Sequence, residues 1–108
     1  MSEVIDRFNA AFQTHDASEL ADVVAEDCVL ENVDGATYSG PGQALGFWSA
    51  LAADHGTTWT VEDVTGDGER ATIRWRARSA DGTVTRGVNL MWLRDGRIAE
   101  ATGYVKIS

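Results

Sequence analysis

The chain opens with a pattern of apolar and polar positions that is typical of an amphipathic helix. Apolar residues recur three and four positions apart over residues 3–14, a spacing that gathers them on one helix face. They are Val4, Ile5, Phe8, Ala11 and Phe12. Glu3 and Asp6 stand near the expected N-terminus, where acidic side chains favour the helix dipole.

Two further helices and one strand are predicted before residue 56. Asp16 is placed to cap a short helix whose apolar stripe holds Leu20, Val23 and Val24. Residues 27–33 then have the pattern of a strand. A third helix follows the loop around Pro41, and its apolar face consists of Ala44, Leu45, Phe47, Trp48 and Leu51.

The rest of the chain reads as strands. Long runs of β-branched and aromatic residues are separated by Gly66-Asp67-Gly68, Asp81-Gly82 and Asp95-Gly96, which are hairpin signals. The predicted strands cover residues 57–64, 70–79, 83–93 and 97–107. Helices followed by an antiparallel meander indicate an α+β fold, in which the three N-terminal helices pack on the concave face of a curved, mostly antiparallel sheet.

The hairpin loops decide which side chains share a sheet face. With three-residue glycine-bulge loops at Asp81-Gly82 and Asp95-Gly96, one face is apolar apart from a single amide. It would carry Ile73, Trp75, Ala77, Gly87, Asn89, Met91, Ala101 and Val105. The other face would carry Arg74, Arg76, Arg78, Arg86, Val88, Leu90, Trp92, Glu100, Thr102 and Tyr104. Two-residue turns would instead align Trp75 with Val88 and Trp92; we favour the bulged register.

Composition narrows the class of protein. A chain of 108 residues with 44% hydrophobic content is expected to form one domain, residues 1–108. With one cysteine, no run of about 20 apolar residues and no ligand cluster, we expect a cytoplasmic protein without membrane contact, metal or cofactor.

The charge is divided unevenly along the chain. Residues 1–69 carry 14 acidic side chains and one basic one, whereas residues 70–108 carry eight basic and three acidic ones. The total of −8 repels phosphate, which argues against nucleic-acid binding. The division instead suggests that oppositely charged surfaces pair, within a subunit or across a dimer.

Three segments follow one another along the chain, namely HDASELADVVAEDCVLE, YSGPGQALGFWSAL and GVNLMWLRDGRIAEATGYV. In this order they resemble the SnoaL-like branch of the nuclear transport factor 2-like superfamily. The resemblance implies a cystatin-like, cone-shaped α+β fold with a pocket between the helices and the sheet. It implies no single function, because the superfamily includes isomerases, cyclases, hydrolases and binding or oligomerisation domains.

Among the families it resembles are ketosteroid isomerases, which use a tyrosine, an aspartate base and a second, neutral aspartic acid. By this resemblance the three positions fall on Phe8, Asn32 and Asn89. Phe8 has no hydroxyl and an amide cannot abstract a proton, so an isomerase-type proton transfer is not expected. Asn89 keeps a hydrogen-bond donor.

We therefore expect a domain that binds a small apolar molecule through inward-facing amides and aromatic walls, with an isomerase-, cyclase- or hydrolase-type reaction in the same pocket left open. The candidate ligand-binding residues are Phe8, Asn32, Tyr38, Trp48, Trp75, Asn89 and Met91. The competing interpretation of the aromatic residues is ordinary core packing. The competing interpretation of the asparagines is that their side chains are hydrogen-bonded to the backbone. An inward Glu31 would restore a general base. The alternative function is a non-catalytic dimerisation or binding module.

The apolar residues expected on the outer sheet face also predict a homodimer through that convex face.

No metal, nucleophile or dinucleotide site is expected from the remaining candidate residues. His15 and His55 lie in polar loops without a third metal ligand, and Cys28 reads as a small buried hydrophobe. The glycines of SGPGQALG do not match the spacing of a dinucleotide-binding loop.

Overall fold

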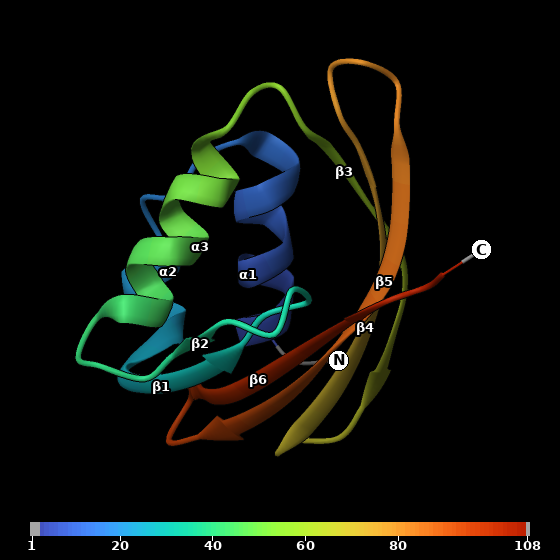
Figure 1. Ribbon diagram of the computed structural model, residues 1–108. Helices are drawn as coiled ribbons and strands as arrows, with labels where there is room; N and C mark the ends of the chain where they lie inside the picture. The colour runs from blue at the N-terminus through green and yellow to red at the C-terminus, as the bar shows by residue number, and fades with distance from the viewer. Residues whose placement is uncertain (1–2, 108) are drawn as a thin grey trace.

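A computed structural model describes residues 3–107 of the chain. Three helices cover the concave face of one curved sheet (Figure 1). The helices are α1 (Glu3–Thr14), α2 (Leu20–Val23) and α3 (Gln43–Ala53). None of the helices within residues 3–107 has the length and apolar character needed to cross a membrane.

The sheet has six strands in the order β2-β1-β6-β5-β4-β3. Their bounds are β1 (Val24–Glu31), β2 (Thr37–Tyr38), β3 (Thr58–Gly66), β4 (Arg70–Arg78), β5 (Val84–Arg94) and β6 (Arg97–Val105). β1 runs parallel to β6, and the other neighbouring pairs are antiparallel. The predicted α+β fold with a mostly antiparallel curved sheet is confirmed.

The boundaries of the early elements differ from the prediction. β1 begins at Val24, a residue predicted to belong to the second helix, and ends at Glu31. Asp16 does not cap α2, because its carboxylate accepts the Ser18 N–H 3.0 Å away within a local turn. The two-residue strand β2 was not predicted, since two residues are too few to show a period.

The predicted face assignment is correct, although one of the two turns differs. Ile73 lies opposite Asn89 across β4 and β5, and Asn89 lies opposite Gly103 across β5 and β6. The Asp81-Gly82 hairpin has the expected three-residue loop, in which the Ser79 N–H bonds the Thr83 carbonyl.

The second hairpin closes with two residues instead of three. Asp95 and Gly96 both have positive φ, at 52° and 76°, and Arg94 pairs directly with Arg97. A register shift follows, because Leu93 pairs with Ile98 whereas Trp92 pairs with Glu100. The extra residue in β6 restores the alignment that a three-residue loop would have given.

The core lies between the helices and one end of the sheet. Its largest fully buried side chains are Ile5, Leu20, Leu30, Met91 and Ile98. Residues from α1, α2, β1, β5 and β6 thus close this end of the molecule. The β4–β5 hairpin extends beyond the helices at the opposite end (Figure 1), so the inner face of the sheet is less completely filled there.

Candidate functional site

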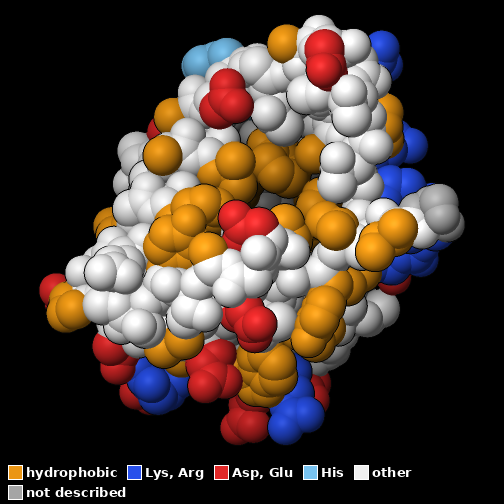
Figure 2. Space-filling view, in the orientation of Figure 1, with side chains coloured by type: hydrophobic (Ala, Val, Ile, Leu, Met, Phe, Trp, Pro, Cys, Tyr) orange, Lys and Arg blue, Asp and Glu red, His pale blue; other side chains and the backbone are white. Residues whose placement is uncertain are grey.

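A cavity of about 320 Å³ lies between the inner face of the sheet and helices α1 and α3. Its walls include Phe8 and Phe12 from α1, Trp48 from α3, Trp59 from β3 and Trp75 from β4. Figure 2 shows a hollow rimmed largely by hydrophobic side chains. The volume falls within the range of pockets that accept small organic molecules.

The aromatic side chains of the wall contact one another in an unbroken series. Phe8 packs edge-on against Trp48 with ring centroids 4.9 Å apart, and Phe8 lies equally far from Phe12. Phe12 then meets Trp59 at 5.5 Å, and Trp59 meets Trp75 at 5.6 Å, both edge-to-face. Each such ring pair stabilises the fold by about 0.5–1.5 kcal/mol beyond the effect of burial, so each aromatic side chain helps to hold its neighbours in the cavity wall.

Trp75 occupies its place because the residue opposite it is a glycine. A Cβ on Gly87 would lie 2.5 Å from Cζ2 of the Trp75 ring, so the indole lies across the neighbouring strand where a side chain would otherwise stand. From there the Trp75 Nε1–H donates to Oδ1 of Asn89, 3.0 Å away. The hydrogen bond fixes the orientation of the Asn89 amide at the cavity wall.

Asn32 reaches the cavity from the other side of β6. It follows β1 directly, and its Nδ2 donates to Oδ1 of Asp34 at 3.3 Å. Gly103 of β6 separates Asn32 and Val33 from Asn89, and a Cβ there would lie 2.9 Å from Cγ1 of Val33 and 3.1 Å from Oδ1 of Asn89. The missing side chain at Gly103 lets Val33 and the Asn89 amide pack over β6.

A third amide, Asn9 on α1, also lines the cavity. Its exposed fraction is 8%, and within residues 3–107 it is the only polar or charged residue that is buried. The sequence-based prediction missed Asn9 because it rested only on the apolar stripe of the helix. The signal is its position four residues after Ile5 and three before Phe12, which places Asn9 on the buried face of α1.

The cavity wall is uncharged. Among residues 3–107, no Asp, Glu, His, Lys, Arg, Cys or Tyr side chain contributes to the wall. Besides the three amides, its polar side chains are the indoles and the hydroxyls of Thr57, Ser79, Thr83 and Thr85. These groups donate and accept hydrogen bonds, but none of them is a general base with a pKa near neutrality.

Five of the seven predicted residues line the cavity, namely Phe8, Asn32, Trp48, Trp75 and Asn89. Met91 and Tyr38 do not, contrary to expectation. Met91 shares the inner sheet face with Asn89 but lies farther under the helices, with an exposed fraction of 1%. Tyr38 stacks on Phe47 with ring centroids 4.5 Å apart, so that Phe47 and not Tyr38 faces the cavity.

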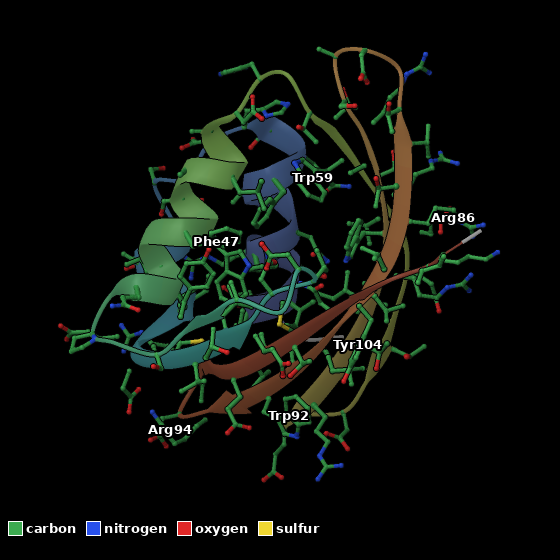
Figure 3. All side chains as sticks on the ribbon, in the orientation of Figure 1. Phe47, Trp59, Arg86, Trp92, Arg94 and Tyr104 are labelled. Atoms are coloured by element: carbon green, nitrogen blue, oxygen red, sulfur yellow. The ribbon has the colours of Figure 1, made fainter. Side chains whose placement is uncertain are left out.

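Trp59 was the main aromatic residue that the prediction overlooked. It lies on the inner side of β3 toward α1 (Figure 3). Its Nε1 is the one fully buried side-chain nitrogen or oxygen in residues 3–107 that lacks a hydrogen-bond partner. The alternation of Trp59 and Val61 along β3 would have revealed it, had the same face assignment been extended to this strand.

The remaining candidates lie outside the cavity. Glu31 is exposed and pairs with Thr102 on the outer face, so it supplies no base to the cavity. Burial raises the pKa of the Cys28 thiol to about 11, which keeps it protonated at neutral pH. His15 stacks on His55 at 4.7 Å, and its Nδ1 lies 3.1 Å from the Ala52 carbonyl oxygen.

Comparison with known proteins identifies similar chains. Residues 5–101 match the model of the SnoaL-like domain. An NTF2-like protein of unknown function from Mesorhizobium loti is 48% identical over 97% of this chain and 89% of that chain, with a TM-score of 0.93. No curated protein sequence matches the chain significantly.

Two more distant structures share the fold. A protein from Sinorhizobium meliloti that is provisionally named a polyketide cyclase is 23% identical, with a TM-score of 0.80 over 95% of this chain and 94% of that one. A computationally designed 17-OHP binder is 21% identical, with a TM-score of 0.77 over 96% of this chain and 91% of its own. At these identities the likeness concerns the fold alone.

Proposed function

The chain belongs to the SnoaL-like domain family, and we propose that it binds a small, uncharged and largely apolar molecule in the cavity between the helices and the sheet. One observation carries the proposal. The cavity, of about 320 Å³, has aromatic and aliphatic walls interrupted by amides and hydroxyls, and no charged side chain among the described residues contributes to it. The amides and hydroxyls of such a wall can orient a ligand by hydrogen bonds, whereas no charged side chain in the described wall could neutralise an ionised ligand.

The cavity argues for a ligand site over a purely structural module. In a dimerisation module, side chains such as Trp48, Trp75 and Met91 would be expected to fill this space. Instead, Met91 is packed in the core while Trp48 and Trp75 stand at the wall of an open volume. Keeping apolar side chains beside a cavity costs stability, since the lost contacts are not regained elsewhere. A bound ligand would restore those contacts.

The same wall restricts the chemistry that this site performs. A general acid or base would need a titratable side chain within hydrogen-bond reach of the ligand, and the described wall has none. The amides can hold or polarise a carbonyl group. The proposed function is therefore binding, and any reaction there would depend on hydrogen bonding to the ligand.

Tryptophan fluorescence and thermal denaturation test this proposal. A panel of steroids, polyketide-like aromatics and terpenoids should include compounds that raise the melting temperature and change the emission. Trp48→Ala should weaken the response, whereas Trp92→Phe, on the outer sheet face, should preserve it. If no member of the panel affects either readout, or if Trp48→Ala leaves the response intact, the proposal fails.

We also propose a homodimer through the convex sheet face. An outer patch consisting of Val88, Leu90, Trp92 and Tyr104 lies near the centre of that face, and Tyr104 is 56% exposed. Tyr104 and Trp92 lie on the side of the sheet away from the helices (Figure 3). Apolar side chains gathered in this way are typical of a protein contact.

Charge placement supports a second copy as the occupant of the outer patch. Arg74, Arg76 and Arg78 of β4 lie to one side of it, whereas Glu31 of β1 and Glu100 of β6 lie to the other. A two-fold axis through the patch and parallel to the strands would bring the arginines of one subunit toward the glutamates of its partner.

Light scattering at micromolar concentration should give twice the monomer mass. Leu90→Glu should reduce it to that of the monomer, because a carboxylate would be buried in the interface. Gln13→Glu, on the exposed side of α1, is the matched control and should remain dimeric. A monomeric mass for the unmodified chain would overturn the proposed dimer without affecting the cavity.

A further inference from the structure

Asn9 is a buried polar side chain without a hydrogen-bond partner among the described residues. It is 92% buried and lines the cavity, yet no hydrogen bond joins its carboxamide to any side chain or backbone group of residues 3–107. Its polar atoms are not fully occluded, since Trp59 Nε1 is the described side-chain atom that is both buried and unpaired. The Asn9 carboxamide therefore offers both a donor and an acceptor to the cavity.

The other two amides are oriented by their protein partners. The Trp75 indole can only donate, so Asn89 must turn Oδ1 toward it, and its Nδ2 donor is left without a partner among the described residues. The Asp34 carboxylate can only accept, so Asn32 must turn Nδ2 toward it, and its Oδ1 acceptor has no partner among residues 3–107. One amide thus presents a donor and the other presents an acceptor.

These two groups reach the cavity from opposite sides of β6. Asn89 pairs with Gly103 on β5, while Asn32 follows β1 on the other flank of the same strand. Because Gly103 has no side chain, Val33 and the Asn89 amide pack closely over β6 at this point. Asn9 lines the same cavity from the helical layer. Amides from three separate elements therefore contribute to one cavity wall.

We propose that the site selects an uncharged ligand carrying both a hydrogen-bond acceptor and a hydrogen-bond donor, of the hydroxyketone or lactam class, and that Asn9 is a specificity-determining residue for it. The inference rests on the ligand-binding function proposed above. A ligand carbonyl would accept from the amide N–H groups, and a ligand hydroxyl or lactam N–H would donate to an amide oxygen. Asn9 would thereby gain the partner that it lacks within residues 3–107.

Anionic ligands are disfavoured by the same wall. A carboxylate placed in the cavity would lose hydration without meeting a cationic side chain among the described residues, and desolvating an unpaired ion is costly. Asp34 adds a negative charge next to Asn32, which disfavours an anion further. The proposal therefore separates neutral from anionic ligands of the same size.

The Asn9→Leu variant tests the role of Asn9, because leucine has a similar volume and lacks the amide. Since Asn9 has no partner among the described residues, the variant should fold and melt at the same or a higher temperature than the unmodified protein. Gln13→Leu removes an exposed amide from the same helix and is the matched control. A clear fall in melting temperature for Asn9→Leu alone would assign Asn9 a structural role and overturn the proposal.

The probes are tetralin, tetralone, hydroxytetralone and tetralin carboxylic acid, which share one bicyclic skeleton and differ in polarity. Isothermal titration calorimetry with the unmodified protein should rank hydroxytetralone first and the carboxylic acid last at neutral pH. In Asn9→Leu the affinity for hydroxytetralone should fall by ~3- to 10-fold relative to tetralin, the effect expected from a lost neutral hydrogen bond. Gln13→Leu should keep the original ranking.

The outcomes distinguish this inference from the proposed function. Equal binding of tetralin and hydroxytetralone, or tightest binding of the carboxylic acid, would contradict the inference while leaving a ligand site in place. An unchanged affinity ratio in Asn9→Leu would remove Asn9 from recognition. Failure of all four probes to bind would count against both this ligand class and the inference, and the wider panel described above would then decide the proposed function by itself.

Discussion

The close approach of Trp75 to Gly87 gives a sharp test of how this site is built. In Gly87→Ala the new Cβ would lie 2.5 Å from Trp75 Cζ2 and also 2.5 Å from the Tyr104 carbonyl oxygen. Both distances are below ordinary contact, and the second involves the backbone of β6. The indole must therefore move, and its 3.0 Å hydrogen bond to Asn89 should break.

The expected loss of stability follows from three contributions. Overpacking costs about 1–3 kcal/mol, and the lost Trp75–Asn89 hydrogen bond adds about 1 kcal/mol. Replacing glycine restricts the unfolded chain and returns about 0.4–1 kcal/mol. The net destabilisation is about 1–3.5 kcal/mol, which corresponds to a fall in melting temperature of about 4–14 °C for a domain of this size.

Urea unfolding followed by circular dichroism measures this free energy, and tryptophan emission reports the displaced indole. Gly46→Ala in α3 is the control, because nothing lies within 4 Å of the Cβ it would add. It should stabilise the protein by about 0.5–1 kcal/mol, as expected inside a helix. If Gly87→Ala proves as stable as the unmodified protein, the account of how Trp75 and Asn89 are positioned is incorrect.

Two further predictions concern titratable groups outside the cavity. The Ser79 hydroxyl and the Thr83 N–H donate to the Asp81 carboxylate and lower its pKa from 3.8 to about 2. A depressed folded-state pKa stabilises the protein above about pH 4 and loses this effect as the pH falls toward 2. Asp81→Ala should therefore flatten the acid dependence of stability over that window, and an unchanged profile from pH titrations of urea unfolding would refute the assignment. Because the pKa of the buried Cys28 thiol is raised to about 11, it should react with a thiol reagent only on unfolding. Stoichiometric modification of the native protein at pH 7 would contradict this.

The sequence was sufficient to predict most of the fold because its periodicities are strong. The long strands and their Asp-Gly turns predict the meander, and the bulged register correctly places Asn89 on the inner face with Trp75. The predicted loop at Asp95-Gly96 was wrong, yet the face assignment survived, because an irregularity in β6 supplies the residue that the two-residue turn omits. Turn length and strand bulge have the same effect on register, and local sequence does not distinguish them.

The candidate site was harder to predict than the fold. Parity along a strand identifies which residues face inward, but it does not show how far the helices cover them, so Met91 was expected at a wall where the core already encloses it. Tyr38 was misplaced because its stacking on Phe47 depends on the position of α3 relative to β2. Asn9 and Trp59 were missed for a related reason, since only tertiary packing shows that both line the same cavity.

The four tryptophans allow the central claim to be tested in one measurement. Trp48, Trp59 and Trp75 line the cavity, whereas Trp92 lies on the outer face of the sheet. Each indole N–H gives its own signal in a nitrogen-15 correlation spectrum of the labelled protein. Titration with hydroxytetralone should shift the signals of the three cavity tryptophans and leave that of Trp92 in place. A spectrum in which Trp92 moves while the other three remain unchanged would contradict a ligand site between the helices and the sheet.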